Sequence, residues 1–146
     1  MISKQLLRRL RDIVGPEGLL SDPADLVCYA GDAAGGLPEV RPDVVVFPTQ
    51  TEQVSRILTL ASEHRVPVYP RGAGTNLSGG AVPLEGGIVL CTVRMDRIKH
   101  LDPVDMYAVV EPGVIIEDLN RRAGEHGLIY PPDPGSVATA TMGGSV

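Results

Sequence analysis

Apolar residues near the start of the chain recur at the spacing of one helix face. The positions on this face are Leu6, Leu7, Leu10, Ile13 and Val14. Ser3 can cap the first turn, Gly15 can end the last one, and polar or basic residues fill most intervening positions. The pattern predicts an amphipathic helix over residues 3–14.

The next clear apolar run is short and β-branched. Residues 21–42 are rich in Pro, Gly and Asp, which predicts a short helical turn followed by an irregular connection. Residues 43–47 (DVVVF) then carry a run of valines that is closed by Pro48. The length and composition of this run predict a buried strand.

Helical spacing returns after this strand. Thr49 and Glu52 have the spacing of a capping box. The helix that follows extends to His64, and its predicted inward positions are Val54, Ile57, Leu58 and Ala61. Residues 66–69 form a second short strand, so the order is strand, helix, strand with short links. This order predicts a βαβ unit with parallel strands and a right-handed crossover.

The second half of the chain begins with short strands. Residues 87–92 predict another buried strand. Residues 97–101 and 106–111 predict an antiparallel pair, because residues 102–105 between them are typical of a turn.

A last helix is predicted over residues 115–126, with Gly127 at its end. Its predicted inward face consists of Ile115, Ile116, Leu119 and Ala123. The tail that follows is irregular and rich in glycine and proline. A βαβ unit followed by strands and then a helix predicts the α+β class rather than a doubly wound sheet.

Composition indicates a soluble globular domain that does not bind nucleic acid. Apolar residues make up 43% and charged residues 21% of the 146 residues, and the net charge is −5. An acidic chain lacks the basic surface that nucleic-acid binding needs. The N-terminus lacks the long apolar stretch of a secretory signal, which predicts a cytoplasmic protein. Cys28 and Cys91 are then expected to be free, buried thiols.

Residues 70–80 (PRGAGTNLSGG) are unusually rich in glycine. A Walker loop is excluded because Gly80 stands where the lysine would be, and a dinucleotide fingerprint is excluded because Leu77 stands where the third glycine would be. Glycines let consecutive N–H groups turn toward one point and bind an anion such as a diphosphate. Arg71 either adds a charge or faces solvent. The alternative for the whole segment is an ordinary surface turn.

A second glycine-rich segment, residues 131–144, either lies against a flat or extended ligand or forms a plain Pro-rich loop. The histidines do not suggest a catalytic base. His64 and His126 fall in the last turns of predicted helices, and His100 falls in a predicted strand, so we expect structural roles for all of them. The spacing of His, Cys and Asp residues predicts no metal site.

Taken together, four stretches resemble a known family. They are residues 41–58 (RPDVVVFPTQTEQVSRIL), 66–83 (VPVYPRGAGTNLSGGAVP), 107–114 (YAVVEPGV) and 131–146 (PPDPGS…TMGGSV). In this order they resemble the FAD-binding domain of the FAD-linked oxidases, the vanillyl-alcohol-oxidase or PCMH type. Within that family the chain is most similar to the FAD-linked subunit of glycolate oxidase and to D-lactate dehydrogenases.

The resemblance implies that residues 1–40 are an N-terminal helix and connecting segment, and that residues 41–146 belong to the FAD-binding domain. This second part would contain the first α+β subdomain and the beginning of the second, with FAD between them. Family enzymes continue beyond this point into a cap domain that holds the substrate. The resemblance therefore assigns no catalytic residue here.

The implied cofactor site has two sides. The side that would wrap the FAD diphosphate consists of Arg71, Gly72, Ala73, Gly74, Thr75, Asn76, Gly79, Gly80 and Ala81. The flavin side would consist of Pro132, Ser136, Gly143 and Gly144. Some relatives attach FAD through a histidine in the loop, and this loop has none, so the implied binding is non-covalent. Ser145 stands where the family usually has Asn, and it keeps a hydrogen-bonding side chain that is shorter than that of Asn.

The implied reaction of the intact enzyme is oxidation of a 2-hydroxy acid such as glycolate or D-lactate by hydride transfer to FAD. A quinone, a cytochrome or an iron–sulfur partner would then take the electrons. The same fold also occurs in peptidoglycan-precursor reductases and aldonolactone oxidases, which remain alternatives. A further alternative is a half-domain that acts only as an interaction module. The chain by itself is expected to be inactive and to self-associate through apolar surface.

Overall fold

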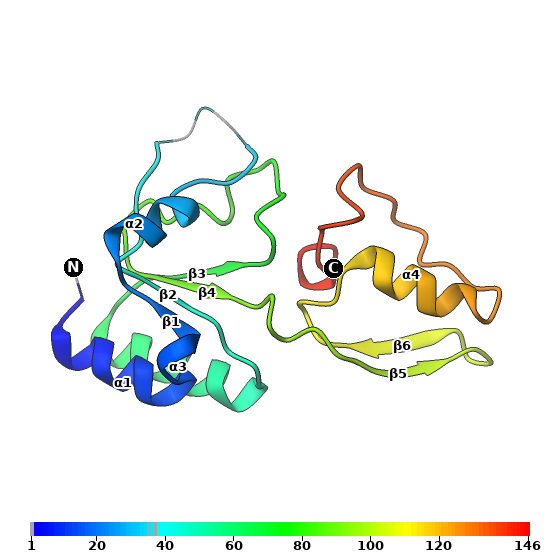
Figure 1. Cartoon of the computed structure of the whole chain (residues 1–146), viewed down its shortest axis with the longest axis horizontal. Helices are drawn as coiled ribbons and strands as arrows, with labels where there is room; N and C mark the ends of the chain where they lie inside the picture. The colour runs from blue at the N-terminus through cyan, green and yellow to red at the C-terminus, as the bar shows by residue number, and fades with distance from the viewer. Residues whose placement is uncertain (1, 35, 37) are drawn as a thin grey trace.

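The computed structural model describes residues 2–34, 36 and 38–146. Met1, Gly35 and Leu37 fall within the predicted N-terminal helix and connecting segment and lie outside the described residues. The described elements form two lobes side by side (Figure 1). The first lobe is built on a four-stranded sheet and the second on a two-stranded sheet, which confirms the α+β class.

The first sheet has the strand order β1-β2-β4-β3. The strands are β1 (Leu19–Leu20), β2 (Val44–Val46), β3 (Val68–Arg71) and β4 (Ile88–Cys91). The parallel direction predicted for β2 and β3 is confirmed, but each pairs with β4, which lies between them. Every residue of β4 is buried, because the strand lies inside the sheet and is covered on both faces. The antiparallel edge strand β1 was not predicted, because two leucines are too short a pattern to indicate a strand.

Helices α1 (Lys4–Val14) and α3 (Thr51–His64) cover one face of this sheet (Figure 1). The Ser3 hydroxyl accepts a hydrogen bond from the Leu6 amide at 3.1 Å, as expected for the N-cap. The core on this face consists of Leu6, Leu10, Leu19, Val44, Val46, Ile57, Leu60, Ala61, Ile88 and Leu90. The alternate strand residues Val45, Val89 and Cys91 face the opposite side.

The opposite face of the sheet is covered by two short helical turns. They are α2 (Pro23–Leu26) and a 3-10 turn, η2 (Val27–Tyr29), and Leu26 and Phe47 complete the core there. Another 3-10 turn, η1 (Pro16–Gly18), links α1 to β1. Cys91 is buried as predicted, whereas Cys28 is exposed because the short turn that carries it leaves its side chain outside this core.

Two local predictions for α3 were wrong. Leu58 is 47% exposed, and Leu60 is buried in its place, because Leu60 lies on the face of Ile57 and Ala61 that packs in the same core as α1. The capping box of Thr49 and Glu52 does not form. Instead the Gln53 side chain accepts from the Thr49 amide at 2.7 Å and donates to the Ile13 carbonyl at 3.0 Å, so a longer amide side chain joins the start of α3 to the end of α1.

The second lobe packs one helix on a hairpin. Strands β5 (Ile98–Asp102) and β6 (Tyr107–Val110) pair antiparallel as predicted, and α4 (Ile116–Gly124) lies against them (Figure 1). The core consists of Val114, Ile116, Leu119, Ala140 and Met142. The helix ends two residues before the predicted position. A 3-10 turn, η3 (Met142–Gly144), ends the irregular tail.

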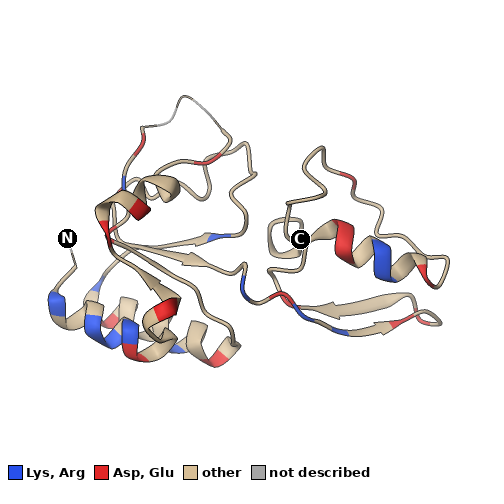
Figure 2. Ribbon diagram, in the orientation of Figure 1, with Lys and Arg blue, Asp and Glu red and all other residues tan. Residues whose placement is uncertain are grey.

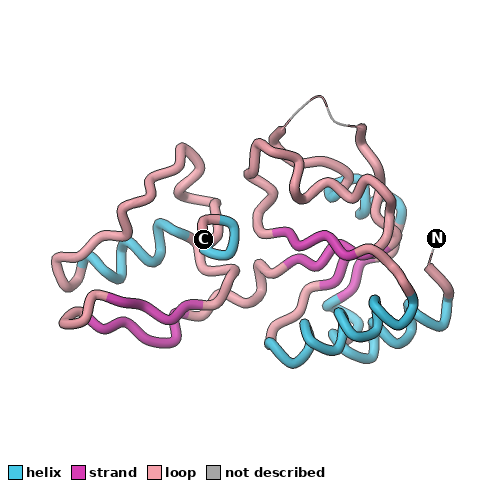
Figure 3. The backbone as a smooth tube through the Cα atoms, turned by 180° about the vertical axis from the view of Figure 1, so that it is seen from behind, coloured by secondary structure: helices cyan, strands magenta, loops and turns pink. Residues whose placement is uncertain are grey.

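The view from behind shows long loops on the side of the sheet where the two lobes face each other (Figure 3). Among the described residues, no helix combines the length and the apolar composition that crossing a membrane requires.

Candidate functional site

The glycine loop leaves β3 at the end of the strand that lies next to β4. Gly74 and Gly79 have φ angles of 78° and 75°, a conformation that side chains other than hydrogen rarely allow. No backbone N–H from Ala73 to Ala81 donates a hydrogen bond to another described residue. This run of amides therefore offers donors to a ligand, as in an anion-binding nest.

The C-terminal segment faces this loop and is fixed by backbone pairing. Ile116 N–H donates to the Ala140 carbonyl at 3.0 Å, and Met142 N–H donates to the Val114 carbonyl at 2.8 Å. This pairing places Thr141, which is 5% exposed, directly against Gly72. A Cβ at Gly72 would overlap the Thr141 hydroxyl oxygen. The two glycine-rich segments identified in the sequence therefore meet in space.

Two hollows lie where these segments meet. The first, of about 200 Å³, is lined by residues 72–76 of the loop and by Pro134, Ser136, Ala140, Thr141, Gly144 and Ser145. The second, of about 350 Å³, is lined by Pro70, Arg71, Gly72, Asn76, Ser78, Gly80, Ala81, Thr92, Pro112, Gly143 and Gly144. Both are lined by Gly72, Asn76 and Gly144, so the two hollows adjoin the same part of the loop.

Most of the residues predicted for the site line these hollows, and two do not. Pro132 is exposed, and Pro134, whose carbonyl accepts from the Val137 amide in a turn, takes the lining position. Gly79 forms a turn in which its carbonyl accepts from the Val82 amide at 3.1 Å. Thr92 and Pro112 line the site but were not predicted, since no local pattern marks them.

The side chains of Arg71 and Asn76 are engaged with the protein. Arg71 Nη1 donates to the Gly31 carbonyl at 2.7 Å, and its guanidinium lies 5.4 Å from the centre of the Tyr29 ring. Asn76 Nδ2 donates to Asp32 Oδ2 at 2.5 Å. The sequence left open whether Arg71 adds a charge to the site or faces solvent. In the structure its side chain is held by Gly31 and Tyr29, so it neither extends freely into solvent nor points only at a ligand.

The groups beneath the loop stay neutral. The Cys91 thiol donates to the Gly72 carbonyl at 3.8 Å. Burial raises the pKa of the Cys91 thiol and that of the Tyr29 hydroxyl. Neither group therefore brings a negative charge under the loop at neutral pH.

A buried carboxylate fixes the corner that forms the far wall of the site. Glu111 is 3% exposed, and the Arg97 guanidinium donates to both of its carboxylate oxygens, at 2.8 and 3.1 Å. These hydrogen bonds lower the pKa of Glu111 to about 2, against the opposing effect of burial. The carbonyl of the next residue, Pro112, accepts from the Gly143 amide at 2.8 Å. The ion pair therefore helps to position both Pro112 and Gly143 in the wall of the site.

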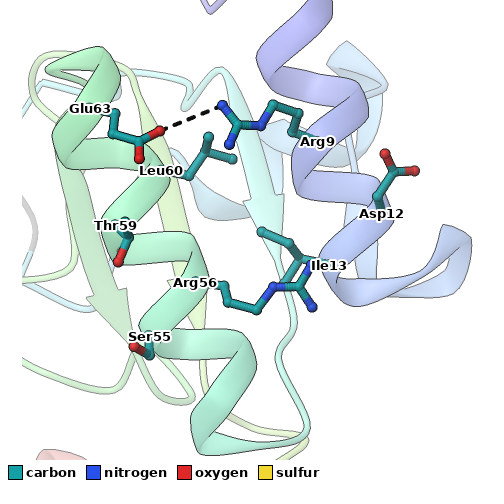
Figure 4. A pocket seen from close by; sticks show the side chains of 8 residues that line it. All are labelled: Arg9, Asp12, Ile13, Ser55, Arg56, Thr59, Leu60 and Glu63. Carbon is teal, nitrogen blue, oxygen red and sulfur yellow. Dashed lines mark ion pairs between the residues drawn. The ribbon is translucent and has the colours of Figure 1, made fainter.

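A separate groove of about 330 Å³ lies between α1 and α3 (Figure 4). Its residues include Arg9 and Glu63, whose charged groups are 3.5 Å apart and about half exposed. Basic residues are concentrated on α1 (Figure 2). This groove lies on the far side of α1 and α3 from the glycine loop, and within the described part of the chain no group of His, Cys, Asp or Glu residues is placed to hold a metal.

A family model described as an FAD-binding domain matches residues 42–146. The chain belongs to this FAD-binding family. The PCMH-type fold and FAD as cofactor, both implied by the sequence resemblance, are thereby confirmed.

Curated relatives match almost the whole chain. It is 44% identical over 146 residues to the glycolate oxidase subunit GlcD of Bacillus subtilis, which covers 100% of this chain and 31% of that protein. It is 33% identical over 145 residues to a D-lactate dehydrogenase of Anaerostipes hadrus, which covers 99% of this chain and 30% of that protein. The FAD-binding chain thus spans about a third of the length of these relatives.

Solved structures share the fold. An alkyldihydroxyacetonephosphate synthase superposes with a TM-score of 0.87 at 24% identity, covering 99% of this chain and 31% of that chain. A p-cresol methylhydroxylase with bound substrate superposes with a TM-score of 0.81 at 26% identity, covering 93% of this chain and 27% of that chain.

The residues present fit the diphosphate and the flat ring system of FAD. The loop amides have no hydrogen-bond acceptor within the described part of the chain, and Arg71 is the single charged residue among the described residues that line the two hollows. A Cβ at Gly80 would meet no atom within 4 Å, so open space adjoins the backbone there. Amide donors and small side chains suit a dianion and a planar group that must approach the backbone closely.

Proposed function

We propose that this chain is the FAD-binding part of an enzyme that oxidises a 2-hydroxy acid of the glycolate or D-lactate type. Its similarity to glycolate oxidase subunits and D-lactate dehydrogenases supports this substrate class. The observation that carries the proposal is the run of amides from Ala73 to Ala81, none of which donates to another described residue. Its first part shares a hollow with small residues of the C-terminal segment, which suits a bound dinucleotide.

In this proposal each side of the site has its own task. The amides of the loop bind the diphosphate, with the hydroxyl of Thr75 as a further donor. Ser136, Gly143 and Gly144 lie along the flavin side, where the absence of bulky side chains lets the backbone approach the ring. The bound FAD supplies the hydride acceptor, while the protein fixes its position and excludes water from one face.

We propose that FAD is held non-covalently. The residues that line the two hollows include no His, Cys or Tyr that could form a bond to the flavin. His64 is at the end of α3, His100 is in β5, and His126 follows α4, all outside the lining of the two hollows. The described side chains that could bond covalently to the flavin therefore lie outside the two hollows.

The base and the electron acceptor of the proposed reaction lie outside this chain in the proposal. No residue of this chain is proposed as the base that takes the hydroxyl proton. The electrons are proposed to pass to a separate acceptor, which is an iron–sulfur protein, a cytochrome or a quinone. By itself the chain is proposed to be inactive and to self-associate, since Val104 and Met106 of the β5–β6 turn are 85% and 73% exposed.

The test uses the full-length gene product, purified with its flavin. We expect acid precipitation to release all the flavin into solution, and glycolate or D-lactate to bleach the flavin absorption in the absence of oxygen. Bleaching by NADPH or by an aldonolactone, but by no hydroxy acid, would favour the alternative flavoenzymes. A colourless protein that added FAD does not stabilise against heat would contradict the proposal and favour an interaction module.

A further inference from the structure

The loop is joined to a short segment that precedes the part of the chain matched by the FAD-binding family. This supporting segment, residues 29–34, connects η2 to the irregular region before β2. The family match begins at residue 42. Both long polar side chains of the loop, Arg71 and Asn76, end on this segment.

Asp32 makes the central contact. Its Oδ1 accepts from the Ala34 amide at 2.9 Å, which fixes the local turn of the supporting segment. Its Oδ2 accepts from Asn76 Nδ2 at 2.5 Å. One carboxylate therefore fixes its own backbone and, through Asn76, the middle of the loop. Asn76 lines both hollows of the site, so its position affects both.

Arg71 makes a second connection at the start of the loop. It donates to the Gly31 carbonyl and lies over the Tyr29 ring. Gly74 passes so close to this guanidinium that a Cβ there would overlap it. The loop thus rests on the Arg71 side chain, and that side chain is fixed by the supporting segment.

We propose that the supporting segment holds the FAD-binding loop in its ligand-binding conformation, with Asp32 as the main positioning residue. The inference rests on the proposal that this loop binds the FAD diphosphate. A glycine-rich loop with unpaired amides would otherwise lose much conformational freedom when it binds. Fixing the loop beforehand reduces that cost and increases affinity.

Electrostatics alone predicts the opposite effect of removing Asp32. A carboxylate near an anion-binding loop repels the diphosphate, so a substitution that removes its charge would strengthen binding if Asp32 had no positioning role. The proposed role predicts weaker binding. The sign of the change in FAD affinity therefore separates the two explanations.

The experiment titrates FAD into the flavin-free, full-length gene product and follows the quenching of flavin fluorescence. We expect Asp32→Ala to raise the Kd for FAD about tenfold, the effect of one lost hydrogen bond to a charged group. Asp32→Asn keeps an oxygen for the Ala34 amide, and its own amide can pair with a turned Asn76, so we expect it to retain most of the affinity. Asp25→Ala removes the same charge at an exposed position of α2, shortly before the supporting segment, and is the matched control.

A double-mutant cycle with Asn76→Ala tests the route of the effect. If Asp32 acts through Asn76, the double variant loses no more affinity than the larger single loss. Unchanged or tighter binding in Asp32→Ala, or multiplied losses in the double variant, would overturn the inference. An equal loss of FAD affinity in Asp32→Asn and Asp32→Ala would also overturn the inference, because the charge of Asp32, and not its hydrogen bonds, would then be what matters.

Gly74→Ala separates this failure from failure of the proposed function. The substitution distorts the loop directly, because it places a Cβ against the Arg71 guanidinium at a positive φ. Weaker FAD binding in Gly74→Ala with unchanged binding in Asp32→Ala would overturn the positioning role alone. Unchanged binding in both variants would overturn the diphosphate site as well. Circular dichroism of each flavin-free variant confirms that the variants compared are folded.

Discussion

Gly72 and Thr141 are in contact where the two lobes meet, with no room for a side chain at Gly72. The backbone of Gly72 is not left-handed, so the contact alone requires glycine there. We expect Gly72→Ala to lower the free energy of unfolding by about 1–3 kcal/mol through overpacking against a buried side chain. Urea unfolding followed by circular dichroism measures this change.

Two further variants control this prediction. A Cβ at Gly144 would lie 4.0 Å from the Thr141 hydroxyl oxygen, an ordinary contact, so Gly144→Ala should change stability little. Combining Gly72→Ala with Thr141→Ala removes the overlapping oxygen and should recover part of the loss. Equal losses in Gly72→Ala and Gly144→Ala would show that the contact with Thr141 is not the cause.

Arg71 is predicted to act through its planar contacts rather than its charge. Arg71→Lys keeps the charge but loses the guanidinium that lies over the Tyr29 ring. We therefore expect the loss of FAD binding free energy in Arg71→Lys to be at least half of the loss in Arg71→Ala. Retention of full affinity in Arg71→Lys, together with a steep loss of affinity in high salt, would contradict this and favour direct contact with the diphosphate.

Arg94 provides a matched control for Arg71. Its guanidinium lies 4.9 Å from the centre of the Phe47 ring and donates to the Glu17 carbonyl at 2.8 Å, and it does not line the site. Arg94→Ala should therefore lower the melting temperature without changing the Kd for FAD. A similar rise in Kd in both alanine variants would indicate a general loss of stability.

The ion pair of Glu111 predicts a defined pH dependence. The folded-state pKa, about 2, lies below the usual value for Glu, so the stabilisation is complete above about pH 4.5 and is lost as the pH falls toward 2. We expect this loss to amount to about 1–2 kcal/mol, less than the full shift implies, because the Arg97 side chain is 66% exposed.

Glu111→Gln should be less stable than the parent at neutral pH and should lose less stability between pH 4.5 and 2. Thermal unfolding across this range measures both effects. Glu85→Gln, at an exposed position, is the control and should follow the parent curve. Parallel curves for Glu111→Gln and the parent would refute the assignment.

Arg65 offers a stabilising substitution. It follows α3 with a φ of 53°, and its amide donates to the Ala61 and Ser62 carbonyls. Glycine adopts this conformation without strain, so Arg65→Gly should raise the free energy of unfolding by about 0.5–1 kcal/mol. His64→Gly, one residue earlier and still helical, should lower it by a similar amount. Urea unfolding of both variants checks the opposite signs.

Sequence periodicity predicted most helices and strands because each one has a single buried face or is wholly apolar. The runs at residues 43–47 and 87–92 are of this kind. The position of β4 between β2 and β3 depends on contacts distant in the chain, which no local pattern records. Either Leu58 or Leu60 could complete an apolar face with Ile57 and Ala61, and it is Leu60 that packs with Leu6 and Leu10 of α1.

The site was predicted in part for the same reason. Glycines mark positions where the backbone must bend or approach closely, so the sequence indicated Gly72, Gly74 and Gly144, which line the hollows. The partners of Arg71 and Asn76 lie about forty positions earlier in the chain, at Gly31 and Asp32, and were not found. The composition of a loop indicates which donors it has but does not indicate which of them the protein already uses.

The interior place of β4 also constrains the order of assembly on the ribosome. While the nascent chain ends before residue 88, β3 has no neighbouring strand to bond with and β2 has only the short β1. The sheet can be completed only after Cys91 has emerged from the exit tunnel. The first lobe therefore folds late in its own synthesis, with its apolar strands open to holdase chaperones until then.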